Sequence, residues 1–240
     1  MISIIIPTLN EELVIAHTLE QIKSIMTMPH EIIVSDGKST DKTLEIARKY
    51  ADIVIEYEGS ERQTIAMGRN AGAARASGEF LVFVDADITI PNPNILFAEL
   101  LNIFAKEKTL SGLIIPIKPL PGSTTFFDRL GMGYFNISYY IFNNIFHIGN
   151  ASGEFQMIPA KIFRQVGGYR KDLVSGEDND MFRRLARVGR TRFASRYAVY
   201  HTCRRAHSRG WLHIIMKSLW SGIYVMIFNK SPYKEWTVIR

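Results

Sequence analysis

Short apolar runs alternate with helical patterns over the first 90 residues. The runs lie at residues 3–6, 31–35, 53–56 and 80–84, and they predict four β-strands. Between the first two, apolar residues recur at helical spacing over residues 15–26 after Asn10, a predicted N-cap. A second helix is expected to begin at Asp41. This alternation predicts an α/β fold with a mostly parallel central sheet flanked by helices.

Polar residues stand where three of these predicted strands end. Thr8 and Glu11 follow the first strand, Asp36 follows the second, and Asp85-Ala86-Asp87 follows the fourth. In open α/β sheets, ligands bind beyond the carboxyl ends of the strands. The sequence therefore predicts a ligand site at this edge of the sheet.

The pattern becomes less regular after residue 90. A helix is predicted near residues 95–104 and a strand at residues 113–117, followed by a Pro/Gly segment that ends at Gly122. Residues 130–153 then contain no Asp, Glu, Lys or Arg, and these 24 residues are long enough to cross a membrane. Polar residues recur within the segment at helical spacing and favour an amphipathic helix instead: Asn136, Tyr140, Asn143, Asn144 and His147.

Residues 211–228 repeat this design near the end of the chain. His213, Lys217, Ser221 and Tyr224 interrupt the apolar positions, so we expect the helix not to span a bilayer. Two aromatic amphipathic helices beside an Arg-rich segment are typical of a protein that lies on a membrane surface. Packing of each helix against the core is the alternative.

Charge is distributed unevenly along the chain, whose net charge is +6. Residues 1–60 contain five Lys/Arg and ten Asp/Glu, whereas residues 161–209 contain thirteen and four. The basic part predicts an anionic partner, such as phosphate or an acidic membrane surface, with a solvated basic surface as the alternative. Nucleic acid is disfavoured because the first 60 residues are acidic and no nucleic-acid recognition motif is present.

Composition favours one compact unit in a reducing compartment. The chain has 240 residues and is 47% hydrophobic, which is enough for a core. The single cysteine, Cys203, excludes an internal disulfide framework and favours the cytosol. The N-terminus lacks a basic region followed by a long apolar stretch, which argues against a signal peptide.

Asp85 and Asp87 are the first candidates for chemistry. One residue separates them at the end of a predicted buried strand, so both carboxylates can approach one cation, and oxygen ligands suit Mg²⁺ or Mn²⁺. Such an ion could bridge two phosphates. The alternative is a turn with solvated aspartates, because a lone Asp-x-Asp is a weak signal.

Four motifs in order make the sequence similar to the family 2 glycosyltransferases. They are residues 4–12 (IIIPTLNEE), 34–41 (VSDGKSTD), 68–72 (GRNAG) and 85–87 (DAD). The resemblance implies a GT-A fold in one domain, residues 1–240. Residues 1–110 would bind the nucleotide sugar, residues 111–205 would bind the acceptor and catalyse transfer, and residues 206–240 would form a C-terminal amphipathic segment.

The resemblance also implies roles for single residues. Pro7, Thr8 and Glu11 would lie along the nucleoside and Asp36 would contact the base. Arg62 and Arg69 are candidates on the nucleotide side. Asp85, Ala86 and Asp87 would bind the diphosphate, with Asp85 and Asp87 holding a divalent metal.

A later acidic motif, Gly176-Glu177-Asp178, begins a predicted helix and also matches the family. The match makes Asp178 the catalytic base, which deprotonates the acceptor hydroxyl and gives inversion at the anomeric carbon, and places Glu177 beside the donor. The alternative for both acids is a favourable interaction with the helix dipole.

Residues 201–209 include three further candidates. His201 follows a strand-like run at residues 196–200 and would complete the metal shell, although a structural histidine is the alternative. Arg204 and Arg205 resemble the basic segment that covers the diphosphate in related enzymes, and guanidinium groups fit phosphate oxygens. Anionic lipid is the other partner they could bind.

Two other functions fit part of the sequence. Residues 84–89 and 176–180 also match, loosely, the acidic motifs of haloacid-dehalogenase-type phosphatases, but that reading leaves 84 patterned residues unexplained. A sugar-nucleotide-binding module without turnover is disfavoured by the retained aspartates. Dinucleotide oxidoreductases are excluded because no glycine fingerprint follows the first strand.

The sequence therefore predicts an inverting, metal-dependent glycosyltransferase. It would move a hexose-type sugar from a UDP- or GDP-sugar to an acceptor hydroxyl or lipid phosphate. A glycan or a polyprenyl-type lipid is the expected acceptor. The expected location is the cytoplasm, at the inner face of the cell membrane.

Overall fold

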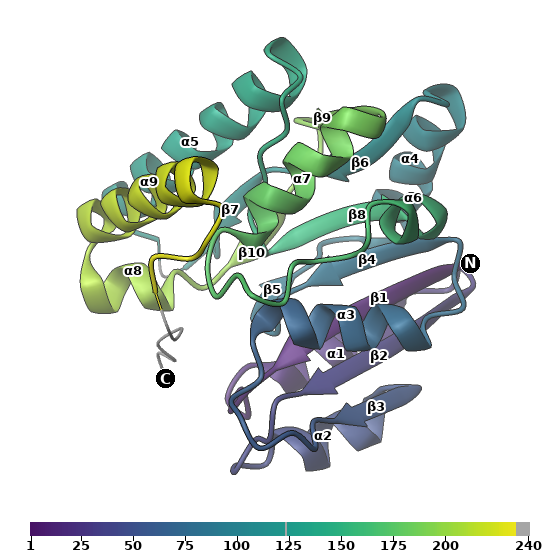
Figure 1. Ribbon diagram of the computed structural model, residues 1–240. Coiled ribbons are helices and arrows are strands. Elements are labelled where there is room, and N and C mark those ends of the chain that lie inside the picture. Colours follow the sequence, from purple (N-terminus) through teal and green to yellow (C-terminus); the bar gives the residue numbers. More distant parts are fainter. Residues whose placement is uncertain (123, 234–240) are drawn as a thin grey trace.

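A seven-stranded, mostly parallel sheet forms the centre of the molecule in the computed structural model, which describes residues 1–122 and 124–233 (Figure 1). Its strand order is β3-β2-β1-β4-β8-β6-β9, and β8 runs antiparallel to both neighbours. The strands are β1 (Ile2–Thr8), β2 (His30–Asp36), β3 (Ile53–Glu56), β4 (Phe80–Val84), β6 (Leu110–Ile114), β8 (Phe155–Pro159) and β9 (Arg190–Phe193). A small second sheet contains β5 (Ile88–Thr89), β10 (Val199–His201) and β7 (Ile117–Pro119), in that order.

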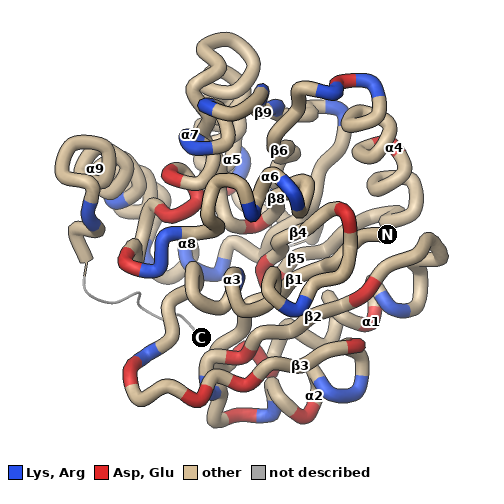
Figure 2. The backbone as a smooth tube through the Cα atoms, turned by 45° about the vertical axis from the view of Figure 1, so that its right-hand side comes forward, with Lys and Arg blue, Asp and Glu red and all other residues tan. Residues whose placement is uncertain are grey.

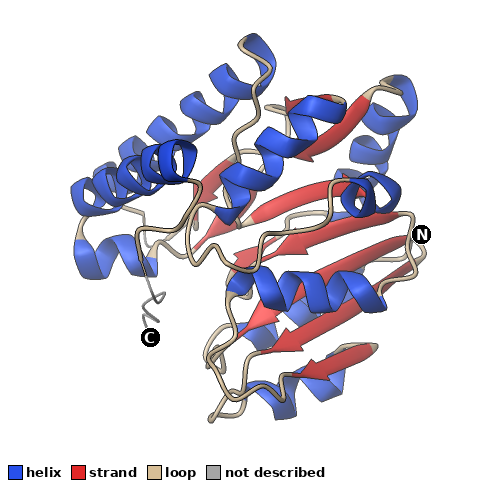
Figure 3. Cartoon of the chain, viewed as in Figure 1, coloured by secondary structure: helices blue, strands red, loops and turns tan. Residues whose placement is uncertain are grey.

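Helices cover both faces of the large sheet, which gives three layers (Figure 3). One face packs against α1 (Ile15–Ile25), α2 (Thr43–Tyr50) and α4 (Pro93–Lys106). The other packs against α3 (Ile65–Arg75), α6 (Ala160–Gln165) and α7 (Glu177–Val188). Beyond the sheet, α5 (Phe126–Tyr140) and α9 (Trp211–Phe228) lie side by side, and the short α8 (Arg204–Arg209) precedes α9 (Figure 1).

The four strands predicted in the first 90 residues are confirmed, and their order positions the predicted site. β1 lies between β2 and β4 and is parallel to both, with Thr8 opposite Asp36. The ends of β1, β2 and β4 are therefore neighbours at one edge of the sheet. The same edge is where the three polar motifs follow their strands.

The predicted N-cap of the first helix is wrong. The helix begins at Ile15, after a turn in which the amide groups of Val14 and Ile15 both donate to the carbonyl oxygen of Glu11. Asn10 instead has a left-handed backbone (φ 56°), and its side-chain oxygen accepts from the Thr40 amide at 2.8 Å. Asn10 therefore joins the loops after β1 and β2.

Two strand predictions in the second half are corrected. Residues 113–117 are not one strand, because the chain turns at Ile115 and Pro116 so that β6 and β7 belong to different sheets. Proline lacks the amide hydrogen that a continuing ladder needs. The run at residues 196–200 forms its strand late, at Val199–His201, so His201 ends the strand and does not follow it.

The amphipathic helix predicted at residues 130–153 is shorter and earlier than expected. It is α5, capped by Thr125 and extended by a π-helical turn at Ile141–Ile145, and the residues that follow are not helical. Two of its asparagine side chains face the protein. The Asn136 amide group bonds to both backbone groups of Ile117 in β7, and Asn144 does the same with Phe193 in β9.

These two asparagines occupy the outer edges of both sheets, since β7 and β9 are the last strands of their sheets. A side-chain amide offers a donor and an acceptor like those of a peptide group, so each asparagine extends the ladder by one pair of hydrogen bonds. The apolar side of α5 is consequently left facing outward.

Candidate active site

A cavity of about 640 Å³ opens at the carboxyl ends of β1, β2 and β4, between these strand ends and the helices α5, α8 and α9. Every residue predicted for the site lines it except Asp36. The lining set comprises Pro7, Thr8, Glu11, Arg62, Arg69, Asp85, Ala86, Asp87, Glu177, Asp178, His201, Arg204 and Arg205. Positions from both ends of the sequence therefore meet at one cavity.

Asp36 lies behind the cavity wall and is fully buried. Its carboxylate accepts hydrogen bonds from the Thr8 hydroxyl at 2.8 Å and from the hydroxyl and amide of Ser39. The Ser39 hydroxyl oxygen in turn accepts from the backbone amide of Asn10. In this structure Asp36 therefore fixes the loops after β1 and β2.

Arg69 joins the two acidic motifs at the centre of the site. Its guanidinium contacts Asp178 Oδ1 at 2.5 Å, Glu177 Oε1 at 3.2 Å and Asp85 Oδ1 at 3.3 Å. It also donates to the carbonyl oxygen of Gly153 at 3.1 Å, and its residue is only 1% exposed. The strand-end motif and the α7 motif therefore share one cleft and one buried cation.

Acidic groups outnumber this cation in the cleft. Burial raises the pKa of Asp85 to about 7, with Arg69 opposing the shift and the nearby carboxylates of Glu154, Asp87 and Asp178 contributing to it. Burial also raises the pKa of Asp178 and of Glu177. An additional positive charge from a ligand would relieve this repulsion.

Asp87 is held by a second set of cations. Its Oδ2 atom lies 3.3 Å from His201 Nε2 and 3.0 Å from an Arg204 nitrogen, and that same Arg204 nitrogen is 2.9 Å from Glu11. These partners lower the pKa of Asp87 despite its burial, and Asp87 raises the pKa of His201 well above its usual value. Arg204 thus links the loop after β1 to the acidic motif after β4.

The donor atoms of this region suit a divalent metal. Carboxylate oxygen and imidazole nitrogen are ligands of Mn²⁺ and Mg²⁺ sites, and the Asp87 and His201 donors are already 3.3 Å apart. Within residues 1–122 and 124–233, no group of three or more His, Cys, Asp or Glu side chains is arranged around one point as a metal site. In this arrangement Asp87 Oδ2 is contacted by both His201 and Arg204.

Replacing Arg69 with Met should destabilise the fold by about 3–5 kcal/mol at pH 8, because buried carboxylates would lose their counter-charge. Carboxylates with raised folded-state pKa values bind protons more readily when folded, so the loss should shrink as the pH falls from about 7 towards 5. Urea unfolding at both pH values measures this. Arg75→Met, at an exposed position of the same helix, is the control and should change stability by less than about 0.5 kcal/mol.

Several polar residues of the cleft were not predicted. Glu154 lines the cavity, and Gln156 and Tyr169 lie buried beside Asp178. Residues 149–156 follow the α5 segment without a motif, and only the antiparallel pairing of β8 with β4 brings them to the site. Strand pairing at this distance in sequence leaves no local signal. Cys203, interpreted as structural, is buried and unpaired.

Comparison with known proteins identifies relatives of one kind. The model of glycosyl transferase family 2 matches residues 3–167. The succinoglycan biosynthesis protein ExoA of Rhizobium meliloti is 27% identical over 198 residues, which cover 78% of this chain and 58% of that protein. Validoxylamine A glucosyltransferase of Streptomyces hygroscopicus is 36% identical over 93 residues, covering 37% and 20%. The chain thus spans at most about three fifths of these relatives.

Solved structures show the same fold. A mannosyltransferase from Pyrobaculum calidifontis, solved with GDP-Man and Mn²⁺, has a TM-score of 0.71 at 19% identity, covering 96% of this chain and 65% of that one. TarS of S. aureus, solved with UDP-GlcNAc, has a TM-score of 0.64 at 22% identity, covering 83% and 57%. The expected GT-A fold is confirmed, and the haloacid-dehalogenase-type alternative is set aside. With its family match extending over more than half of its length, the chain belongs to glycosyl transferase family 2.

Proposed function

We propose that this enzyme moves a hexose from a nucleoside diphosphate donor to an acceptor oxygen with inversion. The observation that carries the proposal is the shared cleft in which Arg69 contacts both Asp85 and Asp178. A leaving diphosphate near the end of β4 and an acceptor near α7 would meet there. Sugar nucleotides are bound by the two solved relatives, GDP-Man in one and UDP-GlcNAc in the other.

The donor half of the proposal uses the residues around the strand ends. Pro7, Thr8, Glu11 and Arg62 would lie along the nucleoside. A divalent metal held by Asp85, Asp87 and His201 would offset the negative charge that develops on the diphosphate. Arg204 and Arg205 would then pair with phosphate oxygens, for which a guanidinium fork is well shaped.

The transfer step needs one base, and we assign this role to Asp178, which lines the cavity. As the acceptor oxygen forms a bond to the anomeric carbon, the bond to the diphosphate breaks and the acceptor proton passes to Asp178. Oδ1 of this residue accepts from Arg69 and Gln156, so the carboxylate has a fixed orientation. Its raised pKa makes the ionised form a stronger base than a solvated aspartate.

A thermal-shift panel tests donor binding. UDP, GDP, ADP and CDP are added with and without Mn²⁺, and a ligand that binds the folded state raises the melting temperature. One uridine or guanosine diphosphate should stabilise the protein, more strongly with Mn²⁺. If none of the four shifts the melting temperature in either condition, the donor proposal is wrong.

The acceptor side of the cleft is apolar and continues to the surface. Met132 and Phe135 of α5 and Ile214 and Ile223 of α9 line the cavity. The outward sides of both helices carry a set of exposed apolar residues: Phe126, Phe127, Leu130, Ile137, Leu212, Met216, Trp220, Met226, Ile227 and Phe228. α9 has one charged residue, Lys217, and is otherwise tan in Figure 2.

This surface, which we call the α5–α9 surface, leads us to propose a lipid-linked acceptor. Exposed apolar residues that extend over two neighbouring helices are typical of an interaction site. Arg209 and Lys217 at the cavity could pair with anionic headgroups. By length and composition alone α9 could also cross a bilayer, and only 11% of it is buried. The polar positions of this helix therefore do not exclude a membrane span, contrary to the expectation from the sequence. Association with the inner face of the cell membrane is the proposed location.

Vesicle sedimentation tests the α5–α9 surface. The protein should sediment with anionic phosphatidylglycerol vesicles at low salt, and the Leu212→Gln/Ile227→Gln variant should bind at least roughly tenfold less, because two apolar side chains no longer enter the lipid. Leu13→Gln is the control, since Leu13 is 81% exposed but lies outside this surface. If the double variant binds like the unchanged protein, the proposal of membrane association through this surface is wrong. The proposal for donor binding does not depend on that outcome.

A further inference from the structure

Gln156 is a fully buried polar residue next to the proposed base. It lies on β8, and its Nε2 atom donates to Asp178 Oδ1 and to the carbonyl oxygen of Ser152, both at 2.8 Å. None of the four motifs includes it. Its amide group spans the space between Asp178 and the buried layer beneath the cavity.

The orientation of this amide decides whether it supports Asp178. With Nε2 towards Asp178, it donates to the carboxylate. If the group rotated by half a turn, Oε1 would face both the carboxylate and the Ser152 carbonyl, and three oxygen acceptors would meet without a proton. A donor at the far end of the amide therefore selects the useful orientation.

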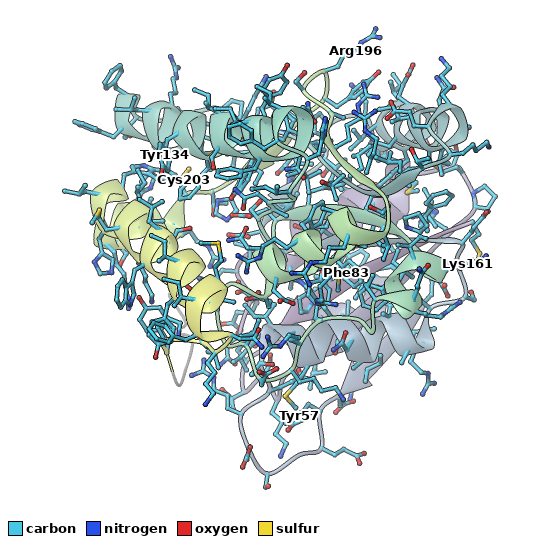
Figure 4. The ribbon with its side chains drawn as sticks, turned by 45° about the horizontal axis from the view of Figure 1, so that its top comes forward. Tyr57, Phe83, Tyr134, Lys161, Arg196 and Cys203 are labelled. Carbon is cyan, nitrogen blue, oxygen red and sulfur yellow. The ribbon has the colours of Figure 1, made fainter. Side chains whose placement is uncertain are left out.

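Tyr169 supplies that donor. Its hydroxyl donates to Gln156 Oε1, and its residue is only 2% exposed. The ring packs edge-on against Phe83, whose side chain is labelled at the centre of Figure 4, at 5.1 Å between centroids. The Arg69 guanidinium lies over the same ring at 5.3 Å.

The backbone of Tyr169 is fixed by the residue next to Arg69. The Asn70 side chain donates to the Tyr169 carbonyl oxygen at 2.7 Å and accepts from its amide at 2.9 Å. Arg69 and Asn70, which are consecutive residues of α3, therefore both support the hydrogen bonds that Asp178 accepts. Arg69 acts directly, and Asn70 acts through Tyr169 and Gln156.

We infer that Tyr169 and Gln156 are positioning residues that set the orientation of the Asp178 carboxylate for proton removal. The inference rests on the proposed role of Asp178. Tyr169 does not line the cavity with the donor-side residues, so its loss should lower kcat and leave donor affinity unchanged. A hydrogen bond to a charged group is worth about ten- to a hundredfold in an equilibrium.

A double-mutant cycle tests whether Tyr169 acts through Gln156. Tyr169→Phe and Gln156→Met should each lower kcat about tenfold, with donor-induced thermal shifts unchanged. In the double variant the loss should equal that of Gln156→Met alone, because the hydroxyl then has no amide to orient. Tyr50→Phe removes a hydroxyl from α2, far from the cavity, and should leave kcat unchanged.

Gln156→Glu is the second variant and keeps the side-chain shape. It places a negative charge beside Asp178, so the acid limb of its kcat–pH profile should move to higher pH. A merely structural role would move stability without moving this limb. The inference is overturned if the two single losses add in the double variant, if Tyr169→Phe keeps full kcat, or if the Gln156→Glu limb stays in place.

These outcomes are separable from failure of the proposed function. Should Asp178→Asn keep full turnover, Asp178 is not the base and both ideas fail. If Asp178→Asn is inactive while Tyr169→Phe is normal, only the positioning role fails.

Discussion

Asp178→Asn should lower turnover by about 10²–10⁴-fold, the usual contribution of a positioned base, and leave donor affinity within about threefold of the original. Asparagine keeps the Oδ1 atom that accepts from Arg69 and Gln156, so the surrounding contacts persist. It cannot take up the acceptor proton. The loss should therefore fall on the chemical step alone.

Initial rates and donor-induced thermal shifts of the same preparations separate these two effects. Asp172→Asn is the matched control. It removes an exposed carboxylate from the segment between α6 and α7, and it should leave both turnover and donor affinity unchanged. A fall in donor affinity as large as the fall in turnover would show that Asp178 binds the donor and is not the base.

Asp87→Asn should weaken donor binding by at least about tenfold in the presence of Mn²⁺, since even outer partners of a bound metal are worth about 10–100-fold in affinity. It removes the charge that pairs with His201 and Arg204. Without Mn²⁺ the loss should be smaller. The difference between the two conditions isolates the metal-dependent part of donor binding.

Titration calorimetry with the nucleoside diphosphate identified by the thermal-shift panel measures both conditions. The control is Asp52→Asn, which breaks the exposed ion pair with Lys23 far from the cavity. Equal donor affinity of Asp87→Asn and the unchanged protein in Mn²⁺ would remove Asp87 from the diphosphate site.

Local patterns were sufficient for the first four strands and for some later elements. The strands β3 and β4 and the helix α9 have the bounds that their apolar runs predict, because the runs are bounded by polar or turn residues. The parallel order then follows from the alternation of strands and helices. The polar motifs at three strand ends line or support one cavity for the same reason.

Contacts between distant positions could not be predicted in this way. Arg69, a nucleotide-side candidate in the sequence, is also a buried partner of Asp85, Glu177 and Asp178, which lie 16, 108 and 109 positions away along the chain. The polar stripe of α5 was equally ambiguous, because asparagine amides can face water or complete the edge of a sheet. Only the positions of β7 and β9 in the fold decide between these two arrangements of the asparagine side chains.

The most direct test is a crystal structure with Mn²⁺ and the bound nucleoside diphosphate, with the metal located by anomalous scattering. The central claim predicts a metal peak bonded to the Asp87 carboxylate and to diphosphate oxygens, in the cavity that Asp178 also lines. A nucleotide bound elsewhere, or with its diphosphate turned away from both Asp87 and Asp178, would contradict it.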